Sequence, residues 1–553
     1  MIEILNRLKQ RPKFLFQILF ASLFVNVLAL ATPIYVIQVL QRYVAYGVTS
    51  TLITLVAGVT FITIFEFFFR NIRHRMAREL EPLNVALADL VMKKLSAIKT
   101  TYYALQKQFR ADIITSHLQI IQQTLTATTV LIVVDFPFVS IFLFALFLIH
   151  YQLGIIVICF LFIPFIVLGL YSNNINTSGK QYLNASINTA RVYDNASTRA
   201  ETLRYFGLVD LLNKSWNLLA NKLVNVRETL EANKNILSSL FSSSQTLLTI
   251  AIIGWGATLA VDGQISVGAL IGANILAARA IAPVIRFAQA FEPLSKSDDA
   301  LKEIRKIMNF PQENQRGTEI KNFNGLINIQ DLYFKYPQTR NPIFEGLSCN
   351  LKPGEVVAVQ GSNGSGKTTL IKTIAGILEF ERGKIFFDNI EITQLSLNWI
   401  RKNLTYVPQE PQFVDGNFLD NHVGLSQIKE NDFKVILNKT DLGNFLNSSD
   451  KGIYMALNNR GEDLPVGIRK RMGLARALVT NGQLVILDEP TEGLDKKGKQ
   501  AVYALLDDFV KSEKTILVST LDEEIIKKAT YVIDLDRKPR PEIIQNNIKY
   551  KLK

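Results

Sequence analysis

The chain has 553 residues, of which 48% are hydrophobic and 20% charged, and its mean hydropathy of +0.18 favours a membrane protein over a soluble one. A net charge of +13 would suit nucleic-acid binding. The basic residues flank apolar stretches, however, which argues against a nucleic-acid partner and for an anionic membrane surface. Cys159 and Cys349 lie far apart without metal-ligating neighbours, so neither a disulfide framework nor a zinc site is expected.

Six apolar stretches in the first half of the chain are each close to the roughly 20 residues that a helix needs to cross a bilayer. They cover residues 14–40, 51–69, 127–150, 154–171, 244–261 and 266–285. We therefore predict an all-α transmembrane domain of six helices over residues 1–308, with the lipid bilayer as its surroundings.

Lysines and arginines predict the orientation of these spans. Segments 1–13, 70–126 and 171–243 carry 21 of them, whereas the three intervening loops carry one, Arg42. The positive-inside rule then places the N-terminus and both long segments in the cytoplasm.

The two long cytoplasmic segments have the composition of helices that extend the spans. Pro82 predicts a bend in the first, and Gly207 interrupts the second. Residues 104–112 and 197–206 are candidate contacts with a cytoplasmic partner, although charged helices of this kind are more often simply solvated. Within the third span, Asp135 precedes Pro137, which predicts a cap or kink, with a substrate contact as the alternative.

From residue 309 the apolar character is lost, and residues 309–324 are predicted to form a linker. Residues 325–553 alternate short β-rich runs with helical stretches. The runs at 326–330 and 332–336 predict an antiparallel portion, and those at 356–359, 405–407, 484–487 and 515–519 predict a parallel sheet with helices on its faces. We thus expect an α/β nucleotide-binding domain fused to the transmembrane domain.

A phosphate-binding loop stands between the run at 356–359 and a predicted helix. Its Gly-x-x-x-x-Gly-Lys-Thr pattern lets backbone N–H groups surround phosphate oxygens at the positive end of the helix. Lys367 can reach the β- and γ-phosphates, and Thr368 can ligate Mg²⁺. The predicted ATP-binding residues here are Gly361, Ser362, Asn363, Gly364, Ser365, Gly366, Lys367, Thr368 and Thr369.

Two carboxylates follow the apolar run at 484–487. At the end of such a strand, Asp488 can hold Mg²⁺ through water, and Glu489 can orient or deprotonate the attacking water. A hydrophobic run ending in two acids is a weak signal alone, but it is strong together with the phosphate loop. We therefore predict Glu489 as the catalytic residue.

With these motifs assembled, the whole chain resembles an ATP-binding-cassette (ABC) exporter half-transporter. The resemblance implies that ATP and Mg²⁺ are bound, that ATP hydrolysis drives transport, and that two halves form a homodimer or a heterodimer. It also implies that Tyr336 stacks on adenine, that Gln409 touches Mg²⁺, and that Asp495 belongs to the D-loop.

Finer features resemble the permease/ATPases of type I secretion systems. They are Asp135-Phe-Pro-Phe138, the run ILAARAIAP at 275–283 and the run IDLDRKP at 533–539. This resemblance implies a bacterial inner-membrane protein that exports a protein substrate, with a periplasmic adaptor and an outer-membrane channel as partners. The N-terminus and the nucleotide-binding domain would both be cytoplasmic.

The chain departs from the family at two places that contact the γ-phosphate. The family signature Leu-Ser-Gly-Gly-Gln is replaced by Leu464, Pro465, Val466, Gly467 and Ile468. The family's switch histidine is replaced by Leu521. Hydrogen bonds to charged groups contribute about 1.5–3 kcal/mol each, so losing two of them in the transition state costs about 10²–10⁴ in rate.

We therefore predict near-normal ATP binding and slow hydrolysis in a homodimer. Arg469, Lys470 or Arg471 could replace the lost contacts, or could simply cover a solvated helix face. The primary interpretation is that the chain is an exporter subunit. The alternative is a hydrolysis-impaired regulatory or structural half that pairs with an active ABC subunit.

Overall fold

The computed structural model describes residues 2–99, 111–313, 317–336, 339–423, 428 and 430–546. The chain forms two compact units, one of residues 1–96 with 107–310 and one of residues 97–106 with 311–553. Most of the candidate contact at 104–112 lies outside the described residues.

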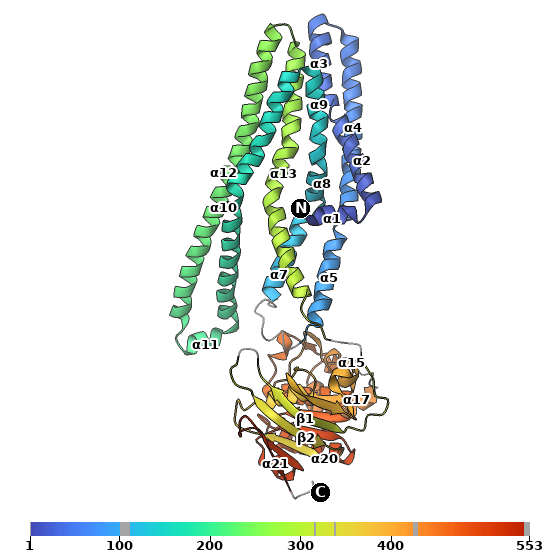
Figure 1. Cartoon of the computed structure of the whole chain (residues 1–553), viewed down its shortest axis with the longest axis vertical. Helices are drawn as coiled ribbons and strands as arrows, with labels where there is room; N and C mark the ends of the chain where they lie inside the picture. Colours follow the sequence, from blue (N-terminus) through green and yellow to red (C-terminus); the bar gives the residue numbers. More distant parts are fainter. Residues whose placement is uncertain are drawn as a thin grey trace. The chain divides into compact units, whose positions relative to one another are not determined.

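The first unit is entirely helical (Figure 1). Its elements are α1 (Ile2–Lys9), α2 (Pro12–Leu28), α3 (Ala31–Gln38), the π-helical η1 (Val39–Val44), α4 (Thr49–Arg78), α5 (Pro82–Ser96), α7 (Ala111–Thr124), α8 (Ala127–Asp135), the 3₁₀ turn η3 (Phe136–Phe138), α9 (Val139–Ile149), α10 (Tyr151–Thr198), α11 (Ala200–Tyr205), α12 (Val209–Val261) and α13 (Val267–Met308).

Six helical segments among the described residues are long and apolar enough to cross a membrane. They begin and end at Pro12–Val44, Thr49–Ser96, Ala127–Ile149, Tyr151–Thr198, Val209–Val261 and Val267–Met308. The six predicted spans are therefore confirmed as helices, and several extend well past the apolar stretch. In Figure 1, α10 and α12 diverge from α13 toward their junction at α11.

Three breaks in these helices occur where the sequence predicts them. Pro82 begins α5 after α4 has ended at Arg78, and Pro137 lies in the 3₁₀ turn between α8 and α9. Gly207 has φ +63° in the turn between α11 and α12, a conformation that favours glycine. Proline and glycine thus mark these three breaks, whereas Pro164, Pro283 and Pro293 lie inside α10 and α13 without ending them.

Close helix contacts and one ion pair hold the bundle together. At Gly272, a Cβ atom would lie 2.4 Å from Ile37 Cγ1, so only glycine lets α13 approach α3 this closely. Arg73 on α4 pairs with Asp135 on α8 at 2.5 Å, with both side chains largely buried. A charge inside a bundle is stabilised by such a partner.

The second unit combines helices and sheets. Its strands are β1 (Ile327–Phe334), β2 (Phe344–Leu351), β3 (Val356–Gln360), β4 (Arg382–Phe387), β5 (Ile390–Glu391), β6 (Leu404–Val407), β7 (Gly416–Asn417), β8 (Ala456–Leu457), β9 (Leu484–Asp488), β10 (Thr515–Ser519), β11 (Tyr531–Asp534) and β12 (Glu542–Gln545). Its α-helices are α14 (Lys367–Ile374), α15 (Leu397–Asn403), α16 (Asp420–Val423), α17 (Glu430–Lys439), α18 (Gly443–Asn447), α19 (Val466–Thr480), α20 (Lys496–Lys511) and α21 (Glu523–Lys528).

Two main sheets are formed by the described residues of this unit. One has the order β12-β11-β3-β10-β9-β6 and is parallel except at β12, and the other is antiparallel with the order β2-β1-β4-β5. Apolar residues of both sheets and of α14 share one core, and residues of α20 and α21 cover the other face of the parallel sheet. The predicted fold class is confirmed.

One predicted boundary needs a correction. The two β-rich runs at 326–330 and 332–336 form a single strand, β1, rather than two. Its register with β2 shifts between Ile329 and Leu332, and Asp331 has φ +45° at this irregularity. The polar residue that separates the two runs in the sequence is therefore a β-bulge within one strand.

A small helical region between β6 and β9 has its own apolar core, in which His422 is buried. The imidazole stacks on Phe418, with 4.1 Å between ring centroids. Its Nδ1 lies 2.6 Å from the Phe418 carbonyl and its Nε2 lies 3.1 Å from the Met472 carbonyl. Arg476 is the charged group that faces it, and burial is the main reason that the pKa of His422 falls to about 4.

This pKa predicts acid sensitivity of the fold. His422 binds a proton near pH 6.5 in the unfolded chain but only near pH 4 in the folded chain. The free energy of unfolding should therefore fall as the pH drops through this window. The loss is about 3 kcal/mol over 2.5 pH units. Thermal unfolding of the unmodified protein and of His422→Phe at several pH values measures it. The variant should lose less stability on acidification, and identical pH profiles would contradict the prediction.

Candidate nucleotide-binding site

The phosphate loop lies between the buried strand β3 and the N-terminus of α14. Gly361, Gly364 and Gly366 have φ values of +150°, +81° and +110°, which only glycine adopts readily. The loop can therefore turn its N–H groups toward one point at the positive end of α14.

The neighbours of the loop leave no room for side chains at two of these glycines. A Cβ atom on Gly366 would lie 2.2 Å from Ile343 Cγ2, and one on Gly361 would lie 2.5 Å from Ser365 Oγ. At Gly364, in contrast, no heavy atom lies within 4 Å of the added carbon. The loop is thus packed tightly at both ends and open in its middle.

Lys367 is buried and directed back over its own loop. Its ammonium group donates to the Gly361 carbonyl at 2.8 Å and lies 3.2 Å from Glu489 Oε1. The two charges that sequence analysis assigns to phosphate binding and to catalysis are therefore direct neighbours.

Ser519 aligns the two carboxylates at the end of β9. The β10–β9 register pairs Ser519 with Asp488, and the Ser519 hydroxyl donates to Asp488 Oδ1 at 2.5 Å. The Glu489 N–H donates to the Ser519 carbonyl at 3.0 Å and contacts its hydroxyl oxygen at 3.1 Å. These contacts hold Glu489 at φ +46°, an unusual conformation for a non-glycine residue.

Asp488 keeps one carboxylate oxygen free within the described residues. Oδ2 is buried and has no hydrogen-bond partner there. A buried unpaired carboxylate oxygen is costly, and a hydrated cation would satisfy it. The donor set of Asp488, Thr368 and Gln409 consists of oxygen groups, which Mg²⁺ prefers.

Most of the predicted site residues line one pocket of about 360 Å³, within the size range of small-molecule sites. They are Tyr336, Ser362, Asn363, Gly364, Ser365, Gly366, Lys367, Thr368, Thr369, Gln409 and Glu489. Tyr336 is anchored by its hydroxyl, 3.1 Å from Thr369 Oγ1, and Gln409 donates to Glu492 at 3.1 Å. Asp488 and Gly361 border this group without lining the pocket.

The remaining predicted residues lie outside this pocket. Pro465 is the N-cap of α19 and has no side-chain cap bond. Val466 is 53% exposed and Leu521 is 56% exposed. Asp495 caps α20 by accepting from the Gly498 N–H at 2.8 Å, which is the main reason that its carboxyl pKa is lowered. Leu464 and Ile468 pack against the helical-region core, and Gly467 has open space beside it.

Two of the three candidate substitute cations are already paired within this chain. Lys470 pairs with Glu492 at 3.7 Å, and Arg471 bonds to Asp441 at 2.6 Å. Arg469 Nε is buried and makes no hydrogen bond among the described residues. Arg469 is therefore the one cation of this run for which no ion pair is found among the described residues.

Sequence reasoning missed three residues that shape the site, namely Ser519, Ile343 and Asp536. Asp536 Oδ1 accepts from the Ser362 N–H at 2.8 Å and from its hydroxyl at 2.7 Å. These bonds lower the pKa of Asp536, the hydroxyl bond being the largest cause. Asp536 lies within the run at 533–539, but only the pairing of β11 with β3 reveals that this run borders the loop.

The chain is similar in sequence to several known proteins. The sequence profile described as ABC transporter matches residues 344–492. The exotoxin translocation ATP-binding protein PaxB of Pasteurella aerogenes is 23% identical over 95% of this chain and 74% of its own length. The alpha-hemolysin translocation ATP-binding protein HlyB of Escherichia coli is 24% identical over the same shares. The leukotoxin export ATP-binding protein LtxB of Aggregatibacter actinomycetemcomitans is 24% identical, again over 95% and 74%.

A solved structure supports the fold over nearly the whole chain. The structure of a bacterial Atm1-family ABC exporter with ATP bound superimposes with a TM-score of 0.83 and 17% identity, covering 97% of this chain and 95% of that one. The resemblance predicted from the motifs is confirmed by these comparisons.

The packing of the loop yields a prediction with an internal control. Gly366→Ala should abolish detectable ATP binding, because the new methyl group would overlap Ile343 at a φ that alanine rarely adopts. Gly364→Ala, where the space is open, should weaken binding only by about the cost of strain, roughly 1–2 kcal/mol. Fluorescent-nucleotide titration measures both, and the double variant Gly366→Ala/Ile343→Ala should recover part of the loss. Equal effects of the two single variants would contradict the steric argument.

Proposed function

The chain carries an ABC transporter domain joined to a membrane domain with the ABC exporter fold, and from this we propose that it exports a protein substrate at the expense of ATP. The observation that carries the proposal is the meeting of the phosphate loop, Gln409 and Glu489 in one pocket, in a chain with six candidate membrane spans. Relatives whose names specify translocation of exotoxin, hemolysin and leukotoxin support a protein cargo.

The protein is a multi-pass membrane protein with its nucleotide-binding unit after the last span. The distribution of lysine and arginine supports a cytoplasmic N-terminus and a cytoplasmic nucleotide-binding unit in a bacterial inner membrane. Export across two membranes would require a periplasmic adaptor and an outer-membrane channel, which we propose as partners in a type I secretion system.

In the proposed mechanism the chain first holds ATP. Tyr336 supplies an aromatic face for adenine, and the loop N–H groups together with Lys367 bind the phosphates. Lys367 then exchanges its bond to the Gly361 carbonyl for phosphate oxygens. Mg²⁺ held by Thr368, Gln409 and Asp488 would neutralise phosphate charge.

Glu489 serves as the group that orients or deprotonates water. Its backbone is fixed by Ser519, so its carboxylate stays at the mouth of the phosphate loop beside Lys367. Fixing a reacting group in this way removes part of the entropic cost of the reaction.

A second half-transporter, identical or different, completes the site. In this proposal the N-terminus of α19 of one half faces the phosphate loop of the other. Pro465 and Ile468 offer no polar side chain there, and Leu521 offers no imidazole. The backbone N–H groups at the start of α19 remain, so closure around ATP is retained while hydrolysis is slow.

Exposed aromatic residues at α11 suit the transmission of closure to the membrane helices. Tyr205 is 86% exposed and Phe206 is 74% exposed, at the turn that joins the two longest helices, α10 and α12. An exposed apolar tip of this kind commonly marks a contact surface, and we propose it as a docking point for a nucleotide-binding unit.

The proposal predicts that two substitutions in the pocket differ in their effect on ATP binding. Lys367→Ala should abolish ATP binding and export, because it removes the cation that reaches the phosphates. Glu489→Gln should keep ATP binding and lower turnover by about 10²-fold or more. Nucleotide binding, hydrolysis and export by the reconstituted protein provide the measurements. Full export by the Lys367→Ala protein would refute the proposed function.

The divergent signature predicts a gain of function. Restoring the family residues with Pro465→Ser, Val466→Gly, Ile468→Gln and Leu521→His should raise hydrolysis by about 10²–10⁴-fold, because each recovered hydrogen bond to the phosphate contributes about 1.5–3 kcal/mol. Ile543→Gln, an equally apolar-to-polar change at an exposed residue of β12, is the matched control. Ordinary transporter turnover by the unmodified protein would contradict the prediction of slow hydrolysis.

A further inference from the structure

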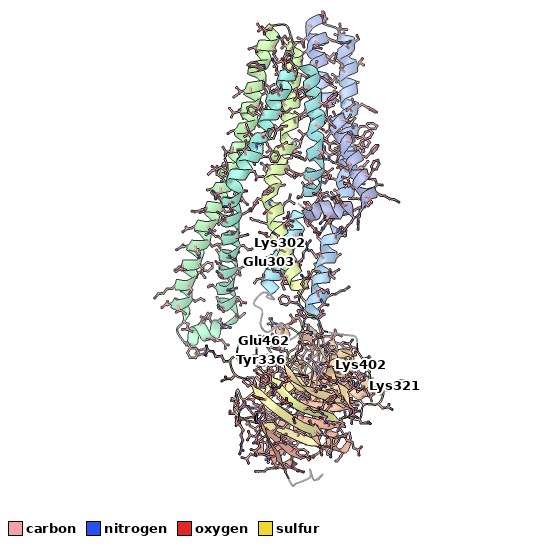
Figure 2. All side chains as sticks on the ribbon, in the orientation of Figure 1. Lys302, Glu303, Lys321, Tyr336, Lys402 and Glu462 are labelled. Atoms are coloured by element: carbon pink, nitrogen blue, oxygen red, sulfur yellow. The ribbon has the colours of Figure 1, made fainter. Side chains whose placement is uncertain are left out.

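A cavity of about 740 Å³ lies within the helical unit, between α7, α10, α12 and α13. Its lining residues lie next to the apolar stretches of these helices in the sequence, and not within them. Figure 2 labels two of them, Lys302 and Glu303, on the lower part of α13. Its lysines come from three helices and are Lys180, Lys234, Lys296, Lys302 and Lys306.

The acidic residues of the cavity are fewer and all lie on α13. They are Glu292, Asp299 and Glu303, so the lining has two more lysines than carboxylates. No arginine lines the cavity among the described residues. The surplus of positive charge favours an anionic ligand.

Two of these carboxylates are each shared between lysines. Asp299 lies 3.2 Å from both Lys180 on α10 and Lys302 on its own helix. Glu292 lies 2.5 Å from Lys296 and 4.0 Å from Lys234 on α12. The ion pairs therefore tie α10 and α12 to α13. Because a lysine ammonium group has three N–H donors, each of these four lysines can also bind a second carboxylate.

One close approach shows that the cavity accommodates a lysine side chain between helices. At Gly179 on α10, a Cβ atom would lie 2.8 Å from Lys296 Cε and 3.0 Å from its ammonium nitrogen. The absence of a side chain at Gly179 lets the Lys296 ammonium group pass against α10 and remain beside Glu292. This placement is a packing feature, unlike that of a lysine extended into solvent.

We propose that this cavity binds an acidic stretch of the exported polypeptide before transport. The inference deepens the proposed function, on which it rests, by naming the substrate class that the cavity selects. Single carboxylates spaced along a chain match lysines that are spaced along three helices. Amide and phenol groups of Asn176, Gln123 and Tyr182 can hydrogen-bond to the peptide backbone. A phosphate group would instead be matched best by the planar fork of arginine.

Binding would also change the ion pairs between helices. A substrate carboxylate that pairs with Lys180 or Lys234 competes with Asp299 or Glu292 for the same ammonium group. This weakens the links of α10 and α12 to α13, so an acidic substrate binds best to the arrangement in which these helices are apart. Such a difference in affinity between two arrangements is what a ligand needs to shift their populations.

The test uses the full chain in nanodiscs of zwitterionic lipid and a labelled peptide of alternating Asp and Ser, compared with its Asn-for-Asp analogue. Fluorescence anisotropy should give tighter binding of the acidic peptide, and added salt should remove the difference. The variant Lys180→Gln/Lys234→Gln should weaken binding of the acidic peptide by roughly two- to fivefold per lysine. The matched control is Lys214→Gln/Lys222→Gln, which removes the same charge from exposed positions on α12 outside the cavity.

The charge-preserving variant Lys180→Arg/Lys234→Arg should retain the preference for the acidic peptide, which separates loss of charge from loss of folding. Equal binding of the two peptides to the unmodified protein would overturn the inference, as would equal losses in the cavity and control variants. The inference would also be overturned if anionic lipid in the nanodiscs abolished peptide binding to the unmodified protein. Lipid headgroups would then be the ligands of the cavity. ATP binding and basal hydrolysis in the same nanodiscs test the proposed function separately, so that failure of one is distinguishable from failure of the other.

Discussion

The nucleotide site depends on the parallel pairing of β3, β10 and β9. This pairing places the phosphate loop, Ser519 and the two carboxylates at the same edge of the sheet. Ser519 then fixes both residues, because its hydroxyl donates to the side chain of Asp488 and its carbonyl accepts from the backbone N–H of Glu489. Both faces of this sheet are buried, so the reacting groups are positioned by a rigid element of the fold.

The residues that depart from the family pattern lie outside the nucleotide pocket, in other parts of the nucleotide-binding unit. The phosphate loop, Asp488 and Glu489 keep the residue types that bind and hydrolyse ATP, whereas Pro465, Val466, Ile468 and Leu521 replace polar or small residues. The three exposed members of this set, Pro465, Val466 and Leu521, are all apolar. In the proposed mechanism, the chain thus retains the groups that hold nucleotide and lacks the groups that would complete the transition state from outside the pocket.

The sequence predicts much of this structure because its strongest signals are local. Six apolar stretches of membrane-spanning length and a glycine-rich loop between a strand and a helix each lie within a short window. Proline and glycine at positions 82, 137 and 207 likewise mark helix breaks by their own backbone chemistry. The sequence does not distinguish the bulge at Asp331 from a gap between two strands, because a polar residue interrupts the apolar pattern in either case.

The residues that sequence analysis missed act through space. Ile343, Ser519 and Asp536 are distant from the phosphate loop in the chain, and each is brought to it only by strand order and register. The lysines and carboxylates of the cavity in the helical unit are similar, since they come from α10, α12 and α13 and their spacing along the chain carries no motif. These residues cannot be predicted from the sequence because no short pattern shows which strands and helices lie next to one another.

The strand order also has a consequence for how the protein is made. Both neighbours of β3 in the sheet, β10 and β11, are synthesised long after the phosphate loop, and Asp536 follows later still. During translation, the membrane helices are therefore complete while the cassette still lacks the strands that enclose its loop. We therefore expect a ribosome-bound chain to insert its helices into the bilayer before it can bind nucleotide, so that hydrolysis begins only after β10 and β11 have emerged from the ribosome.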